Sequence, residues 1–206
     1  QTLQPGNTLA GSLAQGAEPV RYTIEVAPDS FLFGEVDQLT VDVVVRILDP
    51  EGEQVGQFDG PARGPERFVR RLEEGGTYQI EVAPFEDSTG DYTITILRLE
   101  PVETDPARLV AQLMSPYDGD DTPGAAVQVW RDGETLFSRA YGMADLTYGI
   151  PFETDTRTNI GSTSKQFTAF AVMLLVDRGE LSLDDSIRTH LPELPEFTEE
   201  ITVRHL

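Results

Sequence analysis

The sequence predicts two domains: an all-β sandwich over residues 1–100, then the first part of an α/β fold over residues 106–206, joined by a linker at 101–105. Alternating apolar residues without a helical period fill the first hundred positions. A junction containing Pro and Glu follows, and beyond it the pattern changes to a helix, a hairpin and a second helix.

The first domain is recognised by short alternating segments separated by turn residues. Residues 21–26 and 39–48 alternate, an Asp-Pro-Glu-Gly turn occupies 49–52, and residues 76–82 and 90–96 each begin Gly-x-Tyr before alternating again. Strands at this spacing are typical of a β-sandwich. Tyr22, Ile24 and Val26 are predicted to share one face of a strand, and one face of the next strand is predicted to carry Val41, Val43, Val45 and Ile47.

This strand and turn pattern resembles the bacterial pre-peptidase C-terminal domain, a small sandwich attached to secreted enzymes. The resemblance implies a secreted or periplasmic protein, with a signal peptide removed before Gln1. Some related sandwiches bind calcium. The acidic residues of this chain lack the spacing of a ligand set and are predicted to be surface residues, namely Asp29, Glu35, Asp37 and Asp42. We therefore predict no metal and no cofactor.

The composition restricts the possible partners. The formal net charge is −21, and a surface this acidic repels the phosphates of nucleic acid. The chain has no cysteine, so disulfides, thiol nucleophiles and cysteine metal sites are excluded. No apolar run approaches the roughly 18 residues that a membrane span requires. A small-molecule or peptide substrate is the expected partner.

Helix signals delimit the second domain. Asp105 is a predicted N-cap followed by Pro106, and a helix with Leu109 and Leu113 on one face ends before Pro116. Residues 125–131 and 134–141 form a predicted hairpin around Asp132-Gly133, with Trp130 expected in the core and residues 142–159 irregular. A helix from Ser162 to about residue 178 has a broad apolar face and is expected to be buried.

One lysine stands out, because Lys165 is the only lysine among 15 basic residues. Arginine does not lose its proton near neutral pH, whereas a desolvated lysine does. Ser162 precedes this lysine by three residues at a predicted helix start. Residues three apart on a helix are about 5–6 Å apart at Cβ, so the amine can reach the hydroxyl. The helix start also favours negative charge, as a serine nucleophile requires.

The surrounding segment, residues 159–169, reads Asn-Ile-Gly-Ser-Thr-Ser-Lys-Gln-Phe-Thr-Ala and resembles the nucleophile segment of the class C β-lactamase superfamily of serine hydrolases. Residues 123–142, 181–185 and 201–206 resemble that family in the same order. The resemblance implies that Ser162 attacks a carbonyl and that Lys165 helps to deprotonate it. It also implies that the backbone N–H of Ser162 is one oxyanion donor.

The family also has a Tyr-x-Asn motif and a later Lys-Thr-Gly or His-x-Gly motif, and neither follows Lys165 in this chain. Tyr141 and Tyr148 precede the nucleophile and are not substitutes. We therefore expect a truncated hydrolase domain whose remainder completes the site. Ser164 is either support for the site or a helix-surface residue, and His190 and His205 are expected in surface or capping roles.

These observations predict part of an exported serine hydrolase, with a β-lactam, a D-alanyl peptide or a small ester as substrate. An alternative function belongs to another class. The chain would then act through its β-sandwich as an extracellular binding or assembly module, with the hydrolase portion inactive.

Overall fold

The computed structural model describes residues 1–60 and 62–206. By the density of their internal contacts, these residues form two compact units, Gln1–Thr156 and Arg157–Leu206. Within the described residues no helix is both long enough and apolar enough to cross a membrane.

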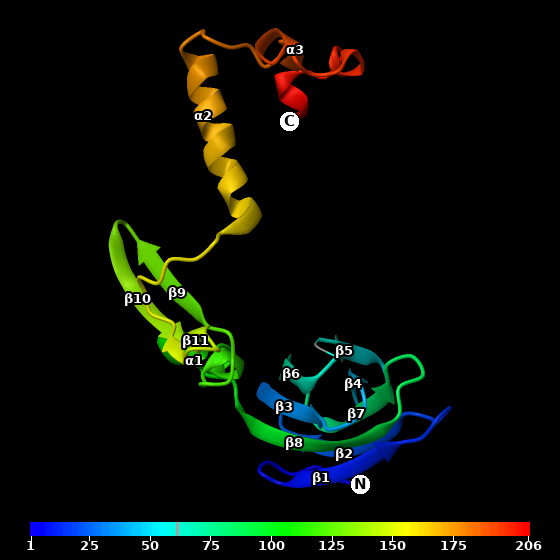
Figure 1. Cartoon of the computed structure of the whole chain (residues 1–206). Coiled ribbons are helices and arrows are strands. Elements are labelled where there is room, and N and C mark those ends of the chain that lie inside the picture. Colours follow the sequence, from blue (N-terminus) through cyan, green and yellow to red (C-terminus); the bar gives the residue numbers. More distant parts are fainter. Residues whose placement is uncertain (61) are drawn as a thin grey trace. The chain divides into compact units, whose positions relative to one another are not determined.

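The first hundred residues form two four-stranded sheets with antiparallel pairing throughout (Figure 1). One sheet has the order β1 (Thr8–Leu13), β8 (Gly90–Pro101), β3 (Ser30–Gln38), β6 (Gly64–Leu72). The other has the order β2 (Val20–Val26), β7 (Gly76–Pro84), β4 (Val43–Leu48), β5 (Gln54–Phe58). The predicted all-β sandwich is confirmed.

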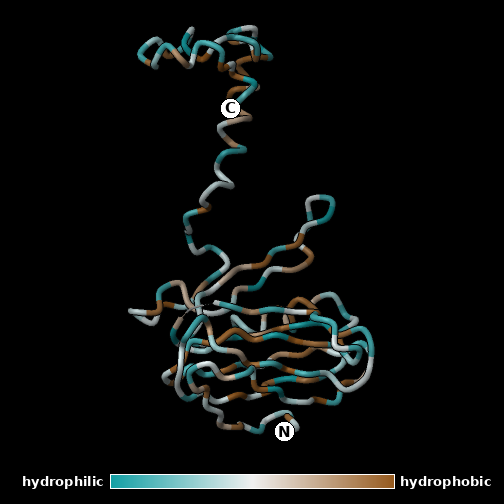
Figure 2. Tube along the Cα trace, turned by 90° about the vertical axis from the view of Figure 1, so that its right-hand side faces the viewer, coloured by the Kyte–Doolittle hydropathy of each residue, from teal (hydrophilic) through white to brown (hydrophobic). Residues whose placement is uncertain are grey.

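The core lies between the two sheets and follows the predicted period of two. All seven side chains that the alternation placed on shared strand faces are buried in one cluster. Figure 2 shows apolar stretches interrupted by polar ones along these strands. The strand predicted from Leu39 begins only at Val43, although Val41 is already buried.

The two Gly-x-Tyr segments belong to different sheets, on strands β7 and β8. The hydroxyl oxygens of Tyr22 and Tyr92 lie 3.0 Å apart in the core. Burial, together with this hydrogen bond, raises the pKa of Tyr92 far above its ordinary value. Tyr92 therefore stays neutral, and the two hydroxyl groups satisfy one another by a hydrogen bond.

Beyond the sandwich, β8 continues through Pro101, so the strand includes the first residue of the expected linker. Helix α1 (Pro106–Leu113) begins as predicted, with the Asp105 carboxylate accepting a hydrogen bond from the Arg108 amide at 3.0 Å. A 3-10 turn, η1 (Ser115–Tyr117), follows. The expected apolar face is wrong in detail, because Leu113 is 50% exposed and the buried residue is Gln112.

The hairpin consists of β9 (Ala125–Arg131) and β10 (Glu134–Tyr141), with positive φ at both turn residues, Asp132 and Gly133. This is the turn that the Asp-Gly pair predicts. The expectation that Trp130 lies in the core is wrong, because the residue is 68% exposed and donates from Nε1 to Thr135 Oγ1. The region expected to be irregular contains a short pair, β11 (Met143–Asp145) and β12 (Ile150–Pro151).

The second unit contains α2 (Lys165–Asp177) and several shorter helical elements. These are η2 (Gly161–Ser164), α3 (Ile187–His190), η3 (Glu196–Thr198) and η4 (Val203–His205). Gly179 ends α2 with φ +71, as predicted for a left-handed C-cap. The expectation that α2 is buried is wrong, because none of its residues is buried and Phe167 and Phe170 are 65% and 66% exposed. The shorter helical elements of this unit leave the apolar side chains of α2 exposed.

Candidate active site

A tight turn positions the serine. The Asn159 side-chain oxygen accepts a hydrogen bond from the Gly161 amide at 2.7 Å, and Gly161 adopts φ +53, a conformation that favours glycine. Ser162 then lies within the 3-10 turn η2, and the α-helix begins only at Lys165. The helix predicted to open at Ser162 therefore starts with one tighter turn.

This turn brings the two predicted site residues together. Lys165 Nζ donates to Ser162 Oγ at 3.0 Å. Both side chains are exposed to solvent. For proton transfer in the reactive direction, the amine must first be neutral and then accept the hydroxyl proton. The geometry suits that transfer without rearrangement.

The neighbouring polar side chains hold the turn. Ser164 Oγ donates to the Gly161 carbonyl at 2.6 Å, which places it in support of the turn rather than beside Lys165 Nζ. Gln166 Nε2 donates to the Thr163 carbonyl at 2.9 Å. Sequence reasoning assigned no role to Asn159 or Gln166. The sequence feature that could have identified them is their position on either side of Ser162, where side chains can bond to the backbone of the turn.

The two histidines have local partners of their own. His190 Nε2 lies 3.0 Å from Asp185 Oδ2, and the amide of Ser182 also donates to that carboxylate. The backbone hydrogen bond from Ser182, and then the one from His190, lower the pKa of Asp185. His205 Nδ1 accepts from the Thr202 amide in a capping box. Across residues 1–60 and 62–206, no group of His, Asp and Glu could hold a metal ion.

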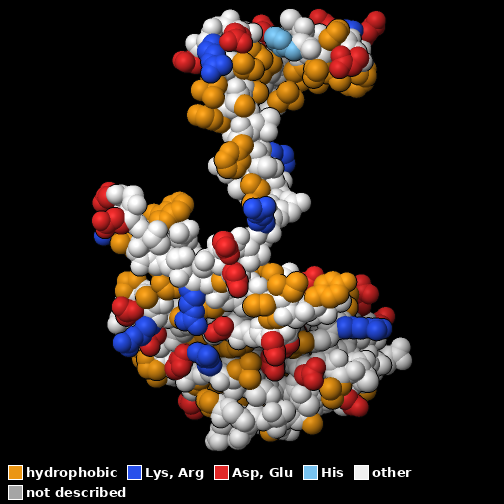
Figure 3. Space-filling model, turned by 60° about the vertical axis from the view of Figure 1, so that its left-hand side comes forward, with side chains coloured by type: hydrophobic (Ala, Val, Ile, Leu, Met, Phe, Trp, Pro, Cys, Tyr) orange, Lys and Arg blue, Asp and Glu red, His pale blue; other side chains and the backbone are white. Residues whose placement is uncertain are grey.

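An apolar groove of about 570 Å³ begins at Lys165 and runs along α2. Hydrophobic side chains are visible on the surface of this unit in Figure 3. The groove is lined on the helix side by Ala169, Val172 and Met173, and on the other side by Leu183, Val203 and Leu206. Lys165 is thus one of the residues that line a largely apolar groove.

A serine hydroxyl bonded to a lysine amine at a helix start is the arrangement found in serine acyl-transfer sites of the Ser–Lys type. Comparison with known proteins agrees. Residues 107–206 match the β-lactamase family model. The resemblance predicted from residues 159–169 is confirmed.

Several relatives carry related sequence. Esterase EstB of Burkholderia gladioli is 37% identical over 124 residues, covering 55% of this chain and 32% of that protein. A β-lactamase of Yersinia enterocolitica is 34% identical over 104 residues, covering 50% and 26%. A D-aminopeptidase of Brucella anthropi is 44% identical over 69 residues, covering 34% and 13%. The chain thus spans a third or less of the length of these relatives.

Two solved structures are similar to part of this chain. The pre-peptidase C-terminal domain of a collagenase from Bacillus anthracis has a TM-score of 0.36 and 16% identity, covering 46% of this chain and 91% of that one. A periplasmic inhibitor of g-type lysozyme from Aeromonas hydrophila has a TM-score of 0.37 and 17% identity, covering 46% and 93%. The sandwich itself is established by its own strand order.

Proposed function

We propose that this chain supplies the nucleophile segment of a serine hydrolase, with Ser162 forming an acyl-enzyme and Lys165 acting as its base. The observation that carries the proposal is the 3.0 Å hydrogen bond between Lys165 Nζ and Ser162 Oγ, within a segment that matches the β-lactamase family model. The relatives include an esterase, a β-lactamase and a D-aminopeptidase. We accordingly propose a β-lactam, a D-alanyl peptide or a small ester as substrate.

The chemistry follows from the pair. Neutral Lys165 takes the Ser162 hydroxyl proton while Oγ bonds to the substrate carbonyl carbon, and the carbonyl electron pair moves onto its oxygen. The Ser162 backbone N–H stabilises that oxyanion. The C–N or C–O bond then breaks, the leaving group receives a proton, and water later hydrolyses the acyl ester.

We also propose that further hydrolase sequence completes the site. The supporting observations are that the chain spans only 13–32% of its relatives and that the apolar face of α2 is exposed. Covering the groove beside Lys165 would remove water from the amine and disfavour its charged form. The remainder of the domain would therefore supply both the second half of the site and the desolvation that activates the lysine.

Intact-mass labelling tests the nucleophile. The hydrolase with its complete domain is incubated with a penicillin or a fluorophosphonate probe, and we expect one adduct on wild type and none on Ser162→Ala. Ser164→Ala is the matched control and should label at a rate close to that of wild type, because its hydroxyl bonds to Gly161 rather than Lys165. No adduct on folded wild-type protein would contradict the proposal and favour the alternative, a binding module acting through the sandwich.

Export is proposed on the resemblance of the sandwich to domains attached to secreted enzymes. Cell fractionation of the natural producer with an antibody against this chain tests it. We expect the protein in the medium or the periplasm, and recovery in the cytoplasmic fraction alone would contradict it.

A further inference from the structure

The outer face of the β1-β8-β3-β6 sheet has two buried aromatic side chains. In β3, Leu32 and Val36 point into the core cluster, so the alternating residues Phe31 and Phe33 point to the opposite face. A sheet face in contact with water would leave such side chains exposed. Instead Phe31 is 1% exposed and Phe33 is 6% exposed, although neither belongs to the core cluster. Other side chains on this outer face therefore cover both rings.

Helix α1 is bonded to this end of the same face. Gln112 Nε2 donates to the carboxylate of Glu100 at 2.9 Å and to the carbonyl of Pro101 at 3.0 Å. Glu100 is paired with Phe31 across the sheet, so the helix lies beside the buried aromatic pair. Gln112 is 4% exposed, which means that water does not compete for these bonds.

Gln112 also forms hydrogen bonds with the expected linker, residues 101–105. Its side-chain oxygen accepts from the Glu103 amide at 3.0 Å, so Gln112 uses its oxygen and its nitrogen on residues just before the helix. The Val102 amide donates to the Asp29 carbonyl at 2.8 Å. A flexible tether leaves such groups to solvent, whereas here the backbone of residues 101–103 is bonded at successive positions.

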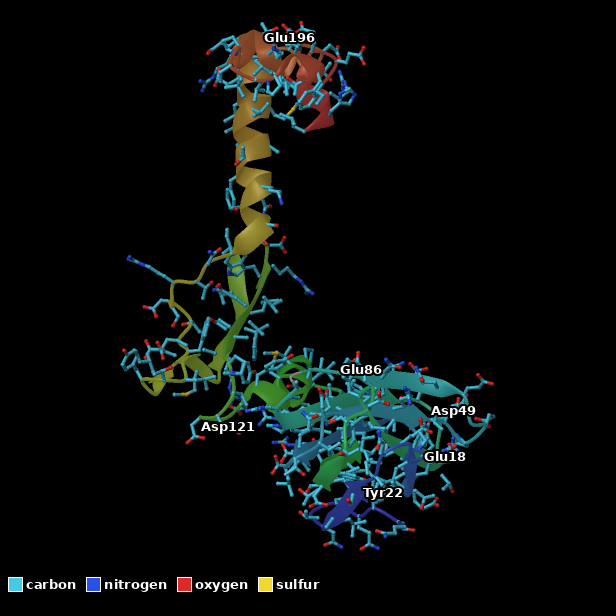
Figure 4. All side chains as sticks on the ribbon, turned by 45° about the vertical axis from the view of Figure 1, so that its right-hand side comes forward. Glu18, Tyr22, Asp49, Glu86, Asp121 and Glu196 are labelled. Carbon is cyan, nitrogen blue, oxygen red and sulfur yellow. The ribbon has the colours of Figure 1, made fainter. Side chains whose placement is uncertain are left out.

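A second contact lies on the neighbouring strand. Arg67 of β6 donates from Nη1 to the Pro116 carbonyl at 3.3 Å and from Nη2 to Asp121 at 3.0 Å. Its Nε lies 3.6 Å from the Glu35 carboxylate, which belongs to the same outer face. Figure 4 labels Asp121 in the loop that follows η1. The guanidinium thus joins the sandwich to the segment that leads into the hairpin.

From these contacts we propose that the sandwich is a built-in structural part of the hydrolase fold, docked rigidly on α1 and η1, and not a module on a flexible tether. The docking surface is the outer face around Phe31 and Phe33. Its partner is the segment 102–121 of the same chain. Gln112 and Arg67 make the hydrogen bonds that hold the sandwich to this segment.

Pulsed electron paramagnetic resonance tests rigidity directly, and the absence of native cysteine makes the labelling specific. Spin labels at Glu73→Cys in the sandwich and Leu113→Cys on α1 occupy exposed positions. In the full chain we expect one narrow distance distribution. A broad distribution, like that of two bodies on a free linker, would overturn the proposal.

Hydrogen exchange tests the hydrogen bonds of Gln112 and Arg67. The Val102 and Glu103 amides should be protected in the full chain, and Gln112→Met should speed exchange at Glu103 about tenfold by removing its acceptor. Gln54→Met, the same change at an exposed position on β5, should leave both amides unaffected. Arg67→Met should speed exchange in η1, while the amides that pair β2 with β7 stay protected. This result would distinguish loss of the contact between the sandwich and residues 102–121 from unfolding of the sandwich. Wild-type Glu103 exchanging as fast as an unstructured peptide would overturn the proposal.

Discussion

Glu66 is a buried carboxylate with one described hydrogen-bond partner. It is 3% exposed on β6, and its Oε2 accepts from the Gly60 amide at 2.6 Å. Burial raises the pKa of Glu66, the Gly60 hydrogen bond lowers it in part, and the negative charges of Asp59 and Asp42 raise it further. A raised pKa means that the folded state holds this proton more tightly than the unfolded state.

Stability should therefore fall as the pH rises from about 4, the ordinary carboxyl range, through the raised pKa of Glu66. Glu66→Gln keeps an acceptor for Gly60 and removes the buried charge. We expect the variant to be more stable than wild type at pH 7, by on the order of 1 kcal/mol, with the difference vanishing in acid. Urea unfolding of both proteins between pH 4 and 8 measures this. Glu18→Gln, at an exposed position, is the control, and an equal gain there would refute the assignment.

Gly11 on β1 faces the ring of Tyr92. A Cβ at this position would overlap that ring, which is fully buried and bonded to Tyr22. We expect Gly11→Ala to destabilise the sandwich by about 1–3 kcal/mol, the usual cost of overpacking. Ser12→Thr adds one methyl group at an exposed position of the same strand and should change the urea midpoint little. Equal midpoints for the two variants would contradict the packing argument.

The residues that sequence reasoning placed correctly are those governed by local rules. Tyr22, Ile24 and Val43 follow the strand period, and Lys165 Nζ reaches Ser162 Oγ as the three-residue spacing predicts. Gln112 and Glu66 were missed because a polar side chain is buried only where tertiary contacts satisfy its hydrogen bonds. The periodicity of the sequence does not indicate which residues make those contacts. Trp130 was misplaced for the converse reason, since a strand alternation does not tell which face is covered.

Among the elements, α2 has the most exposed apolar surface. Phe167 and Phe170 are about two-thirds exposed, and Met173 and Leu174 are also exposed. An exposed stripe of this kind drives association in water. We expect the 206-residue chain to self-associate, and Phe167→Ser with Phe170→Ser to shift it toward monomer in sedimentation velocity. The unfolding free energy should change by less than about 0.5 kcal/mol, because neither ring is buried. An unchanged sedimentation profile would show that the face does not associate.

The two compact units should differ in local stability. The sandwich has a continuous core, whereas Arg157–Leu206 has only Ile187 and Thr198 buried among its described residues. An isolated helix of 13 residues is marginal in water without packing. In hydrogen exchange, we expect the amides of β3, β7 and β8 to be protected far longer than those of α2. Comparable protection in α2 would show that its apolar face is covered in solution.

The charge of the chain acts on all of these elements together. With 36 acidic and 15 basic residues, the folded state confines a net charge of −21. Four of the ion pairs between described residues join two exposed side chains, and such pairs contribute little. Self-repulsion should therefore outweigh pairing, and salt should stabilise the chain by screening it.

The test is thermal unfolding across ionic strength at pH 7. Raising salt from about 0.01 M to 0.15 M shortens the screening length from about 30 Å to about 8 Å. We expect the Tm to rise over this range, equally in sodium chloride and choline chloride, because screening does not depend on the identity of the cation. At pH 5 the rise should be smaller, since the carboxylates begin to accept protons and the net charge falls. A Tm that falls with salt would mean that attraction between the ion pairs exceeds the repulsion of the excess carboxylates.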